Sequence, residues 1–102
     1  MDLELNNKSV IVTGGGSNIG RGIVLAFAQE GANITLADID EKQAGQVAEL
    51  ALKKGAADVQ VIKTDVTNLE QVKAMVNAAD SKFGGVDVLV NNVGWDDLMF
   101  FT

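Results

Sequence analysis

The chain has 102 residues, a formal net charge of −6 and 47% apolar residues, which fits one folded domain. It contains no Cys, His or Tyr, so disulfides, zinc-finger sites and a Ser-His-Asp triad are excluded. The acidic balance disfavours a nucleic-acid partner, and no apolar run is long enough to predict a membrane span or signal peptide. We therefore expect a cytoplasmic protein without a metal site.

Four short, β-branched apolar runs predict strands at residues 9–13, 33–37, 59–63 and 86–90. Between them, apolar residues recur at helical spacing, which predicts three amphipathic helices. Their expected buried residues are Ile19, Ile23 and Phe27 in the first, Ala44, Val47, Ala48 and Ala51 in the second, and Leu69, Val72, Val76, Ala79 and Phe83 in the third. Right-handed crossovers then give an α/β fold, a Rossmann-type doubly wound parallel sheet in the order 3-2-1-4.

The helix ends carry local signals as well. Asp40 with Gln43 and Thr67 with Glu70 have the spacing of capping boxes. Gly31, Gly55 and Gly84 stand where a left-handed residue would end each helix. The whole chain, 1–102, is therefore expected to form one domain of the order β-α-β-α-β-α-β.

Residues 13–20, TGGGSNIG, link the first predicted strand to the first helix. Glycines allow a tight turn and close backbone approach, and the amides that open the helix would face a bound diphosphate. A glycine-rich turn that binds nothing is the alternative, which the position between a strand and a helix disfavours. A P-loop is excluded because no Gly-Lys-Ser/Thr follows.

Asp38 ends the second predicted strand, about 20 residues after the loop, where dinucleotide-binding domains place an acid that accepts hydrogen bonds from the ribose hydroxyls. The alternative role, a solvated carboxylate at a strand end, suits Asp40 and Glu41 better. The uncharged Ser17 and Ile39 offer no partner for a 2′-phosphate, and Arg21 is expected to point away from the ribose. Together these residues predict NAD as the cofactor, and not NADP.

With these residues placed, the sequence from 5 to 102 resembles the short-chain dehydrogenase/reductase family. Residues 13–20 resemble its Thr-Gly-x-x-x-Gly-x-Gly loop, Asp65-Val66 its adenine-contacting pair, and residues 91–94 (NNVG) its Asn-Asn-Ala-Gly motif. The resemblance implies an NAD-dependent oxidoreductase that acts on a secondary alcohol or ketone and forms homo-oligomers. The implied cofactor-binding residues are Gly14, Gly16, Ser17, Asn18, Ile19, Gly20, Asp38, Ile39, Asp65, Val66, Asn92, Val93 and Gly94.

Two loop residues depart from the family pattern. Asn18 replaces the middle glycine, where we expect it to tolerate a left-handed backbone, and Val93 replaces an alanine. The family's reaction is carried by an Asn, a Ser and a Tyr-x-x-x-Lys pair beyond the fourth strand, so no catalytic residue is assigned. We expect the 102-residue chain alone to be inactive, cut after its fourth strand, with the edge at residues 86–91 left open for association with other chains.

Three alternatives concern substrate and class. Residues 92–96 and 101–102 resemble 2-hydroxycyclohexanecarboxyl-CoA dehydrogenases within the family, which implies an alicyclic hydroxyacyl-CoA substrate. An S-adenosylmethionine-dependent methyltransferase also uses a glycine loop and an acid at the second strand, although residues 91–94 argue against it. A redox-inert binding module would fit the missing Tyr.

Overall fold

A five-stranded sheet in the order β3-β2-β1-β4-β5 runs through the middle of the computed structural model, which describes residues 4–92 and 99–101. The strands are β1 (Ser9–Thr13), β2 (Asn33–Asp38), β3 (Asp58–Lys63), β4 (Val88–Asn91) and β5 (Met99–Phe101). The helices are α1 (Asn18–Gln29), α2 (Glu41–Lys54) and α3 (Leu69–Phe83). The predicted parallel order 3-2-1-4 is confirmed.

The expected open edge at the fourth strand is wrong. β5 pairs with β4 antiparallel, with Leu89 opposite Phe101 and Asn91 opposite Met99. An unpaired strand leaves a row of backbone groups available for pairing, and residues 99–101 take up that row. The strand also begins at Val88 instead of Val86. Asp87 before it is bound to Ser9, whose amide donates to the Asp87 carboxylate and whose carbonyl accepts from the Asp87 amide, at 2.8 Å each.

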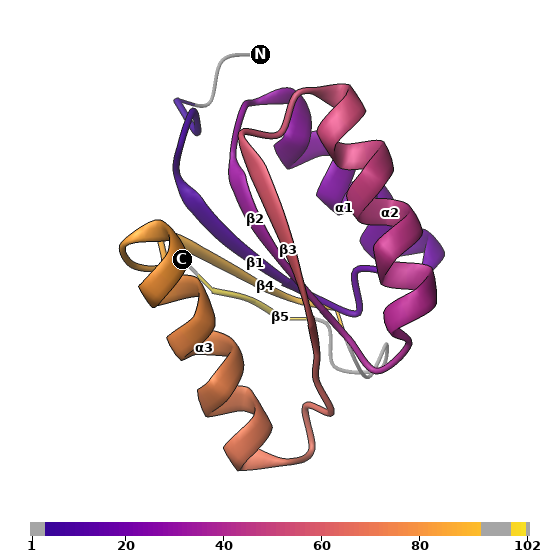
Figure 1. Cartoon of the computed structure of the whole chain (residues 1–102), viewed down its shortest axis with the longest axis vertical. Helices are drawn as coiled ribbons and strands as arrows, with labels where there is room; N and C mark the ends of the chain where they lie inside the picture. Colours follow the sequence, from indigo (N-terminus) through magenta and orange to yellow (C-terminus); the bar gives the residue numbers. More distant parts are fainter. Residues whose placement is uncertain (1–3, 93–98, 102) are drawn as a thin grey trace.

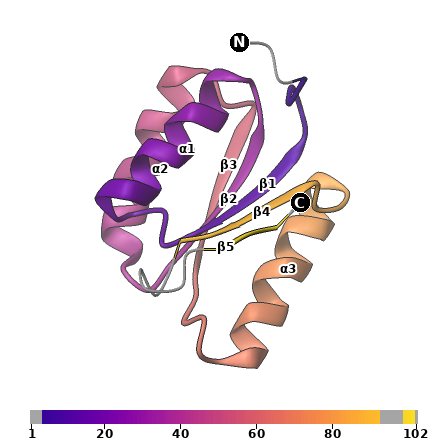
Figure 2. The same ribbon diagram turned by 180° about the vertical axis from the view of Figure 1, so that it is seen from behind.

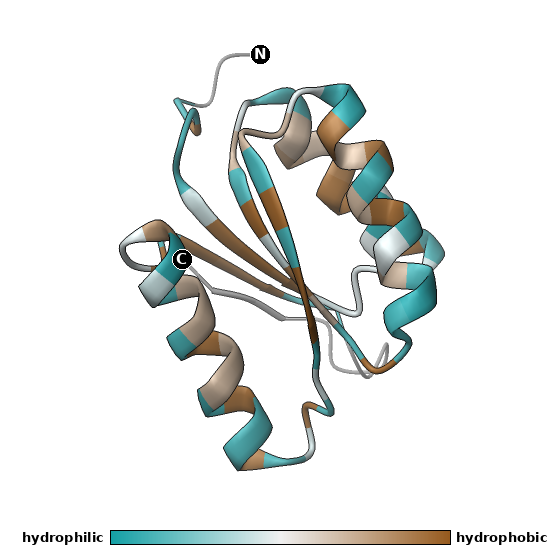
Figure 3. Ribbon diagram, viewed as in Figure 1, coloured by the Kyte–Doolittle hydropathy of each residue, from teal (hydrophilic) through white to brown (hydrophobic). Residues whose placement is uncertain are grey.

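The two faces of the sheet are covered unequally. Figure 1 and, from behind, Figure 2 show α1 and α2 on one face and α3 alone on the other. Among the described residues, the buried apolar cluster of the two-helix face consists of Val10, Val12, Val24, Ala28, Ala32, Ile34, Leu36, Val47, Ala51 and Val90. That of the one-helix face consists of Ile11, Ala37, Met75 and Ala79. The apolar colour of the central strands in Figure 3 reflects this burial on both sides, as expected of a parallel sheet between helices.

The predicted buried positions hold for α2 and in part for α1, where Ile23 and Phe27 are partly buried against the core. Ala44, Val47 and Ala51 of α2 are buried, whereas α1 buries Gly20, Val24 and Ala28 and leaves Ile19 59% exposed. Small residues at 20 and 28 allow α1 to approach the sheet closely, and Ile23 and Phe27 of the predicted stripe pack, partly buried, at the side of this contact.

In α3 the buried residues are Met75 and Ala79, and Val72 packs beside them. Leu69 and Val76 of the predicted stripe are 65% and 38% exposed. With a single helix on this face, part of its apolar surface has no described partner. Among the described residues, no helix is long and apolar enough to cross a membrane.

Two of the helix starts and ends differ from the sequence signals. Asp40 caps α2 as predicted by accepting from the amide of Gln43, but α3 is capped by Asn68 and not by Thr67. The Thr67 hydroxyl is engaged with Asp65 instead. Gly55 and Gly84 cap α2 and α3 in the left-handed conformation as predicted, while α1 ends at Gln29 and is capped by Glu30, with the left-handed Gly31 one residue later.

Candidate functional site

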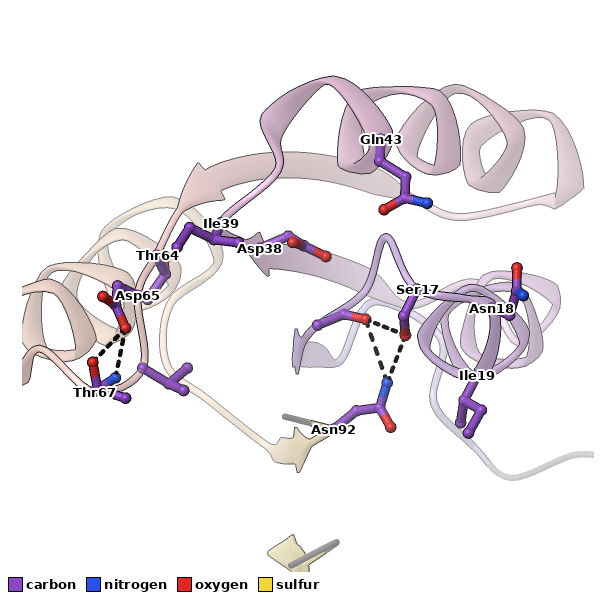
Figure 4. A pocket seen from close by; sticks show the side chains of 12 residues that line it. Ser17, Asn18, Ile19, Asp38, Ile39, Gln43, Thr64, Asp65, Thr67 and Asn92 are labelled. Atoms are coloured by element: carbon purple, nitrogen blue, oxygen red, sulfur yellow. Dashed lines mark hydrogen bonds between the residues drawn. The ribbon is translucent and has the colours of Figure 1, made fainter. Parts of the chain in front are cut away.

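A cleft of about 600 Å³ opens at the carboxyl ends of β1 to β4, where the order of the strands reverses. Its lining comes from the loop after each of these strands and the start of α2 (Figure 4). The lining residues are Gly14, Ser17, Asn18, Ile19, Asp38, Ile39, Gln43, Thr64, Asp65, Val66, Thr67 and Asn92. In doubly wound sheets this is the position at which ligands bind.

The glycine loop brings the start of α1 against the end of β1. Gly14 adopts a left-handed φ of 65° and its amide donates to the Ala37 carbonyl at 2.7 Å. A Cβ on Gly20 would overlap the carbonyl oxygen of Gly14, and one on Gly15 would overlap the side chain of Leu36. The contact at Gly20 is with backbone, which cannot move aside as a side chain can. The loop therefore needs glycine here for close packing.

Ser17 closes the loop through its side chain. Its Oγ caps α1 by accepting from the amide of Gly20 at 3.0 Å, and it donates to the Gly14 carbonyl at 2.8 Å. The first amides of a helix have no acceptor within it, so those of Asn18 and Ile19 remain available at the positive end of α1. Backbone donors and a helix dipole at one point form a site for an anion.

Asn18 does not need the left-handed backbone expected for it. Among the described residues other than glycine, only Glu4 and Asn7 have a positive φ, and Asn18 is the first residue of α1. The side chain is exposed and points away from the loop in Figure 4. Replacing the family's middle glycine by Asn therefore causes no backbone strain.

The Asp38 carboxylate is fixed by two backbone amides. Oδ2 accepts from Gly16 at 2.8 Å and Oδ1 from Asp40 at 2.9 Å. A Cβ on Gly16 would lie 2.8 Å from Oδ2, so Gly16 supports the site although it does not line the cleft. Each carboxylate oxygen can accept a further hydrogen bond, which leaves Asp38 able to bind hydroxyl groups from the cleft.

Asp65 lies at the end of the neighbouring strand, β3. Its Oδ1 accepts from the Thr67 hydroxyl at 2.6 Å and from the Thr67 amide at 2.9 Å. These bonds, the hydroxyl first, hold the pKa of the Asp65 carboxyl below its usual value. The amide of Thr64 donates to the Asp38 carbonyl at 3.0 Å, which ties this strand end to that of β2. The cleft thus presents two carboxylates from adjacent strands.

Thr13 holds the end of β4 at the edge of the cleft through its side-chain hydroxyl. Its hydroxyl donates to Asn91 Oδ1 at 2.8 Å and accepts from the amide of Asn92 at 3.0 Å. Asn92 Nδ2 then donates to Ser17 Oγ at 3.1 Å and to the Gly14 carbonyl at 3.3 Å (Figure 4). This network joins the end of β4 to the glycine loop, so the loop is supported from two strands.

Nine of the thirteen predicted residues line the cleft: Gly14, Ser17, Asn18, Ile19, Asp38, Ile39, Asp65, Val66 and Asn92. Gly16 and Gly20 support it from behind, and Val93 and Gly94 lie outside the described residues. Sequence reasoning missed Gln43, Thr64 and Thr67. The two threonines flank the Asp65-Val66 pair, which could have pointed to them, whereas Gln43 is brought in by the packing of α2. Arg21 does not line this cleft but a neighbouring hollow of about 180 Å³ between α1 and α2, which shares Asn18 and Gln43 with the cleft.

Comparison with known proteins identifies a family for this chain. The model of the short chain dehydrogenase family matches residues 8–102. Galactitol 2-dehydrogenase of Agrobacterium fabrum is 44% identical over 96 residues, which cover 94% of this chain and 36% of that protein. The chain therefore spans little more than a third of the length of that relative.

Solved structures also resemble this one. The structure of hydroxysteroid dehydrogenase from Escherichia coli superimposes with a TM-score of 0.83 at 36% identity, covering 88% of this chain and 38% of that one. An NAD⁺-bound xylitol dehydrogenase gives a TM-score of 0.80 at 32% identity, covering 84% and 33%. At 36% and 32% identity, these two proteins are similar to this chain in sequence as well as in fold.

Proposed function

The chain belongs to the short chain dehydrogenase family, and from that premise we propose that its cleft binds NAD as the cofactor-binding part of an oxidoreductase acting on a secondary alcohol or ketone. The observation that carries the proposal is the meeting of the Gly14 turn, the α1 amides and the Asp38 carboxylate around one cleft. Nicotinamide dinucleotides supply hydride transfer when bound, and the protein supplies binding and orientation.

The residues present fit such a ligand. The amides of Asn18 and Ile19 at the start of α1 match a diphosphate, and the Asp38 carboxylate matches the hydroxyls of the adjacent ribose. Ile39, 63% exposed at the rim, offers an apolar surface to a purine ring, and Asp65 offers an acceptor for its amino group. The other predicted residues, Gly16 and Gly20 behind the loop and Val93 and Gly94 after β4, are proposed to support the same site.

A preference for NAD over NADP follows from charge. A 2′-phosphate would lie beside the Asp38 carboxylate, and like charges at close range disfavour binding. Neither Ser17 nor Ile39 carries a compensating positive charge, and Arg21 lies in the other hollow. The lost hydrogen bonds and the repulsion are expected to cost NADP about 1–3 kcal/mol, or roughly ten- to a hundredfold in affinity.

The substrate and the activity belong to the proposal. Two similar proteins are named for the polyols galactitol and xylitol, which supports a secondary alcohol as substrate and leaves the hydroxyacyl-CoA as a second candidate. No residue of the chain is assigned to proton transfer, so the 102-residue chain alone is proposed to bind cofactor without turnover. Cytoplasmic location and homo-oligomerisation are part of the same proposal.

Calorimetric titration of the chain with NADH, NADPH and S-adenosylmethionine tests this function. We expect NADH to bind most tightly, and Asp38→Ala to reduce the preference for NADH over NADPH. Asp80→Ala, which removes an exposed carboxylate on α3 away from the cleft, is the matched control and should keep it. Equal affinities for NADH and NADPH in the parent chain, or tighter binding of S-adenosylmethionine, would contradict the proposal.

A further inference from the structure

Gly16 lies where the glycine loop, the end of β2 and the start of α2 meet. Its amide donates to Asp38 Oδ2 at 2.8 Å, and a Cβ at this position would lie 2.8 Å from the same oxygen. That Cβ would also lie 3.2 Å from the backbone nitrogen of Ala44 and 3.3 Å from the Cβ of Gln43, both in α2. The family's loop pattern leaves residue 16 open, but in this chain the residue is buried with little space on two sides.

We propose that Gly16 is a positioning residue, which holds the Asp38 carboxylate where it excludes a 2′-phosphate and thereby sets the preference for NAD over NADP. The proposal rests on the proposed function, because it takes the adenosine ribose to lie against Asp38. Asp38 lines the cleft and Gly16 lies behind it, so Gly16 acts through the carboxylate and not on the ligand. Figure 4 shows the carboxylate turned from the end of β2 toward the glycine loop.

The position of the carboxylate is fixed from two segments of the chain. Gly16 donates to one of its oxygens and the amide of Asp40 to the other. Because each oxygen is held, the side chain of Asp38 is expected to keep one orientation. Repulsion between two anions weakens with distance and with intervening water, so a carboxylate that could turn into solvent would exclude a phosphate less well. A fixed carboxylate is also preorganised to accept from ribose hydroxyls.

A methyl group at residue 16 would act on the carboxylate before it acts on the fold. The φ of Gly16 is not in the left-handed region, so alanine fits the backbone. The carboxylate of Asp38 is the end of a side chain and can rotate away, whereas the contact with the backbone of Ala44 requires only a small shift. Gly16→Ala is therefore expected to displace the carboxylate and to preserve the loop.

The neighbouring glycine provides a matched control. A Cβ on Gly15 would overlap the side chain of Leu36 and lie 3.4 Å from that of Val24, both in the core. Gly15→Ala should therefore lower the stability of the fold without moving the Asp38 carboxylate. The two alanine variants differ by one residue in the same loop, one directed at the carboxylate and the other at the core.

The experiment measures dissociation constants for NADH and NADPH by calorimetry on the 102-residue chain and its variants. The ratio of the two constants on one variant cancels any loss of folded protein, because both ligands bind the same folded state. Gly16→Ala should reduce the preference of the parent for NADH by roughly three- to tenfold. Gly15→Ala should lower the unfolding midpoint and leave the ratio unchanged.

Two further variants separate the position of the carboxylate from its charge. Asp38→Glu keeps the charge but moves it one methylene away from the amide of Gly16, so it should reduce the preference without any change in the loop. In the Asp38→Ala background, Gly16→Ala should change the ratio no further, because the group that it positions is gone.

Three results would each overturn the inference while NADH binding still supports the proposed function. They are an unchanged ratio in Gly16→Ala or in Asp38→Glu, an equal change of the ratio in Gly15→Ala, and an effect of Gly16→Ala that persists without the Asp38 carboxylate. Absence of NADH binding by the parent chain would overturn both the inference and the proposed function.

Discussion

The two sides of the cleft are kept in place by different means. On one side, β1, α1 and β2 contribute to the larger apolar cluster of the described residues, which supports the glycine loop and Asp38 from below. On the other side, Asp65 follows the edge strand β3 and precedes α3, which alone covers the smaller apolar cluster of the described residues. There the order comes from local hydrogen bonds to Thr67 and Gln71. Close packing positions the first carboxylate, and a hydrogen-bonded turn positions the second.

The largest expected difference between the two faces concerns their cores. Ile34 and Ile11 are both fully buried in neighbouring strands, Ile34 under two helices and Ile11 under α3. Truncation of either to alanine is expected to destabilise the fold by about 2–5 kcal/mol. Ile34→Ala should be at the upper end, because two packed helices collapse less into the cavity than one helix does. Urea unfolding followed by circular dichroism measures both, and an equal or greater loss for Ile11→Ala would contradict the comparison.

Smaller changes in stability, opposite in sign to each other, are expected when two glycines of α1 are replaced by alanine. Gly20→Ala places a Cβ against the backbone of Gly14 and should destabilise the fold by about 1–3 kcal/mol, with loss of dinucleotide binding. Gly22, two residues later in the same helix, has nothing within 4 Å of a Cβ. Gly22→Ala should therefore stabilise α1 by up to about 1 kcal/mol. Unfolding midpoints of the two variants decide this. A neutral Gly20→Ala would show that the loop has room to relax.

The same contrast explains how much could be predicted from the sequence. The strand order and the glycine loop followed from short-range patterns, because buried parallel strands and tight turns restrict the residue types strongly. The stripes 19/23/27 and 20/24/28 of α1 have the same period. Packing against the sheet fully buries the second, which includes a glycine and an alanine, and only partly buries Ile23 and Phe27 of the first. Periodicity alone gives no weight to such small residues.

Other features depended on contacts between distant parts of the chain. β5 returns to β4 because of an edge that exists only once the sheet has formed. Gln43 enters the cleft through the packing of α2, and nothing in its neighbours indicates a ligand. At the start of α3, two residues could cap the helix, and the hydrogen bond from Thr67 to Asp65 leaves that position to Asn68. Which of two neighbouring residues caps a helix thus depends on the hydrogen bonds that each makes in the folded chain.

The central claim is that one cleft at the carboxyl ends of β1 to β4 binds the dinucleotide along its whole lining. The most direct measurement is an NMR titration of the ¹⁵N-labelled chain with NADH, following every backbone amide. We predict that shift changes concentrate at residues 14–20, at Asp38 and Ile39, at Asp65 and Val66, and at Asn92, with the outer surface of α3 unaffected. Changes centred on α3 or on Arg21, Gln46 and Leu50, which line the neighbouring hollow and not the cleft, or none at saturating NADH, would contradict the account.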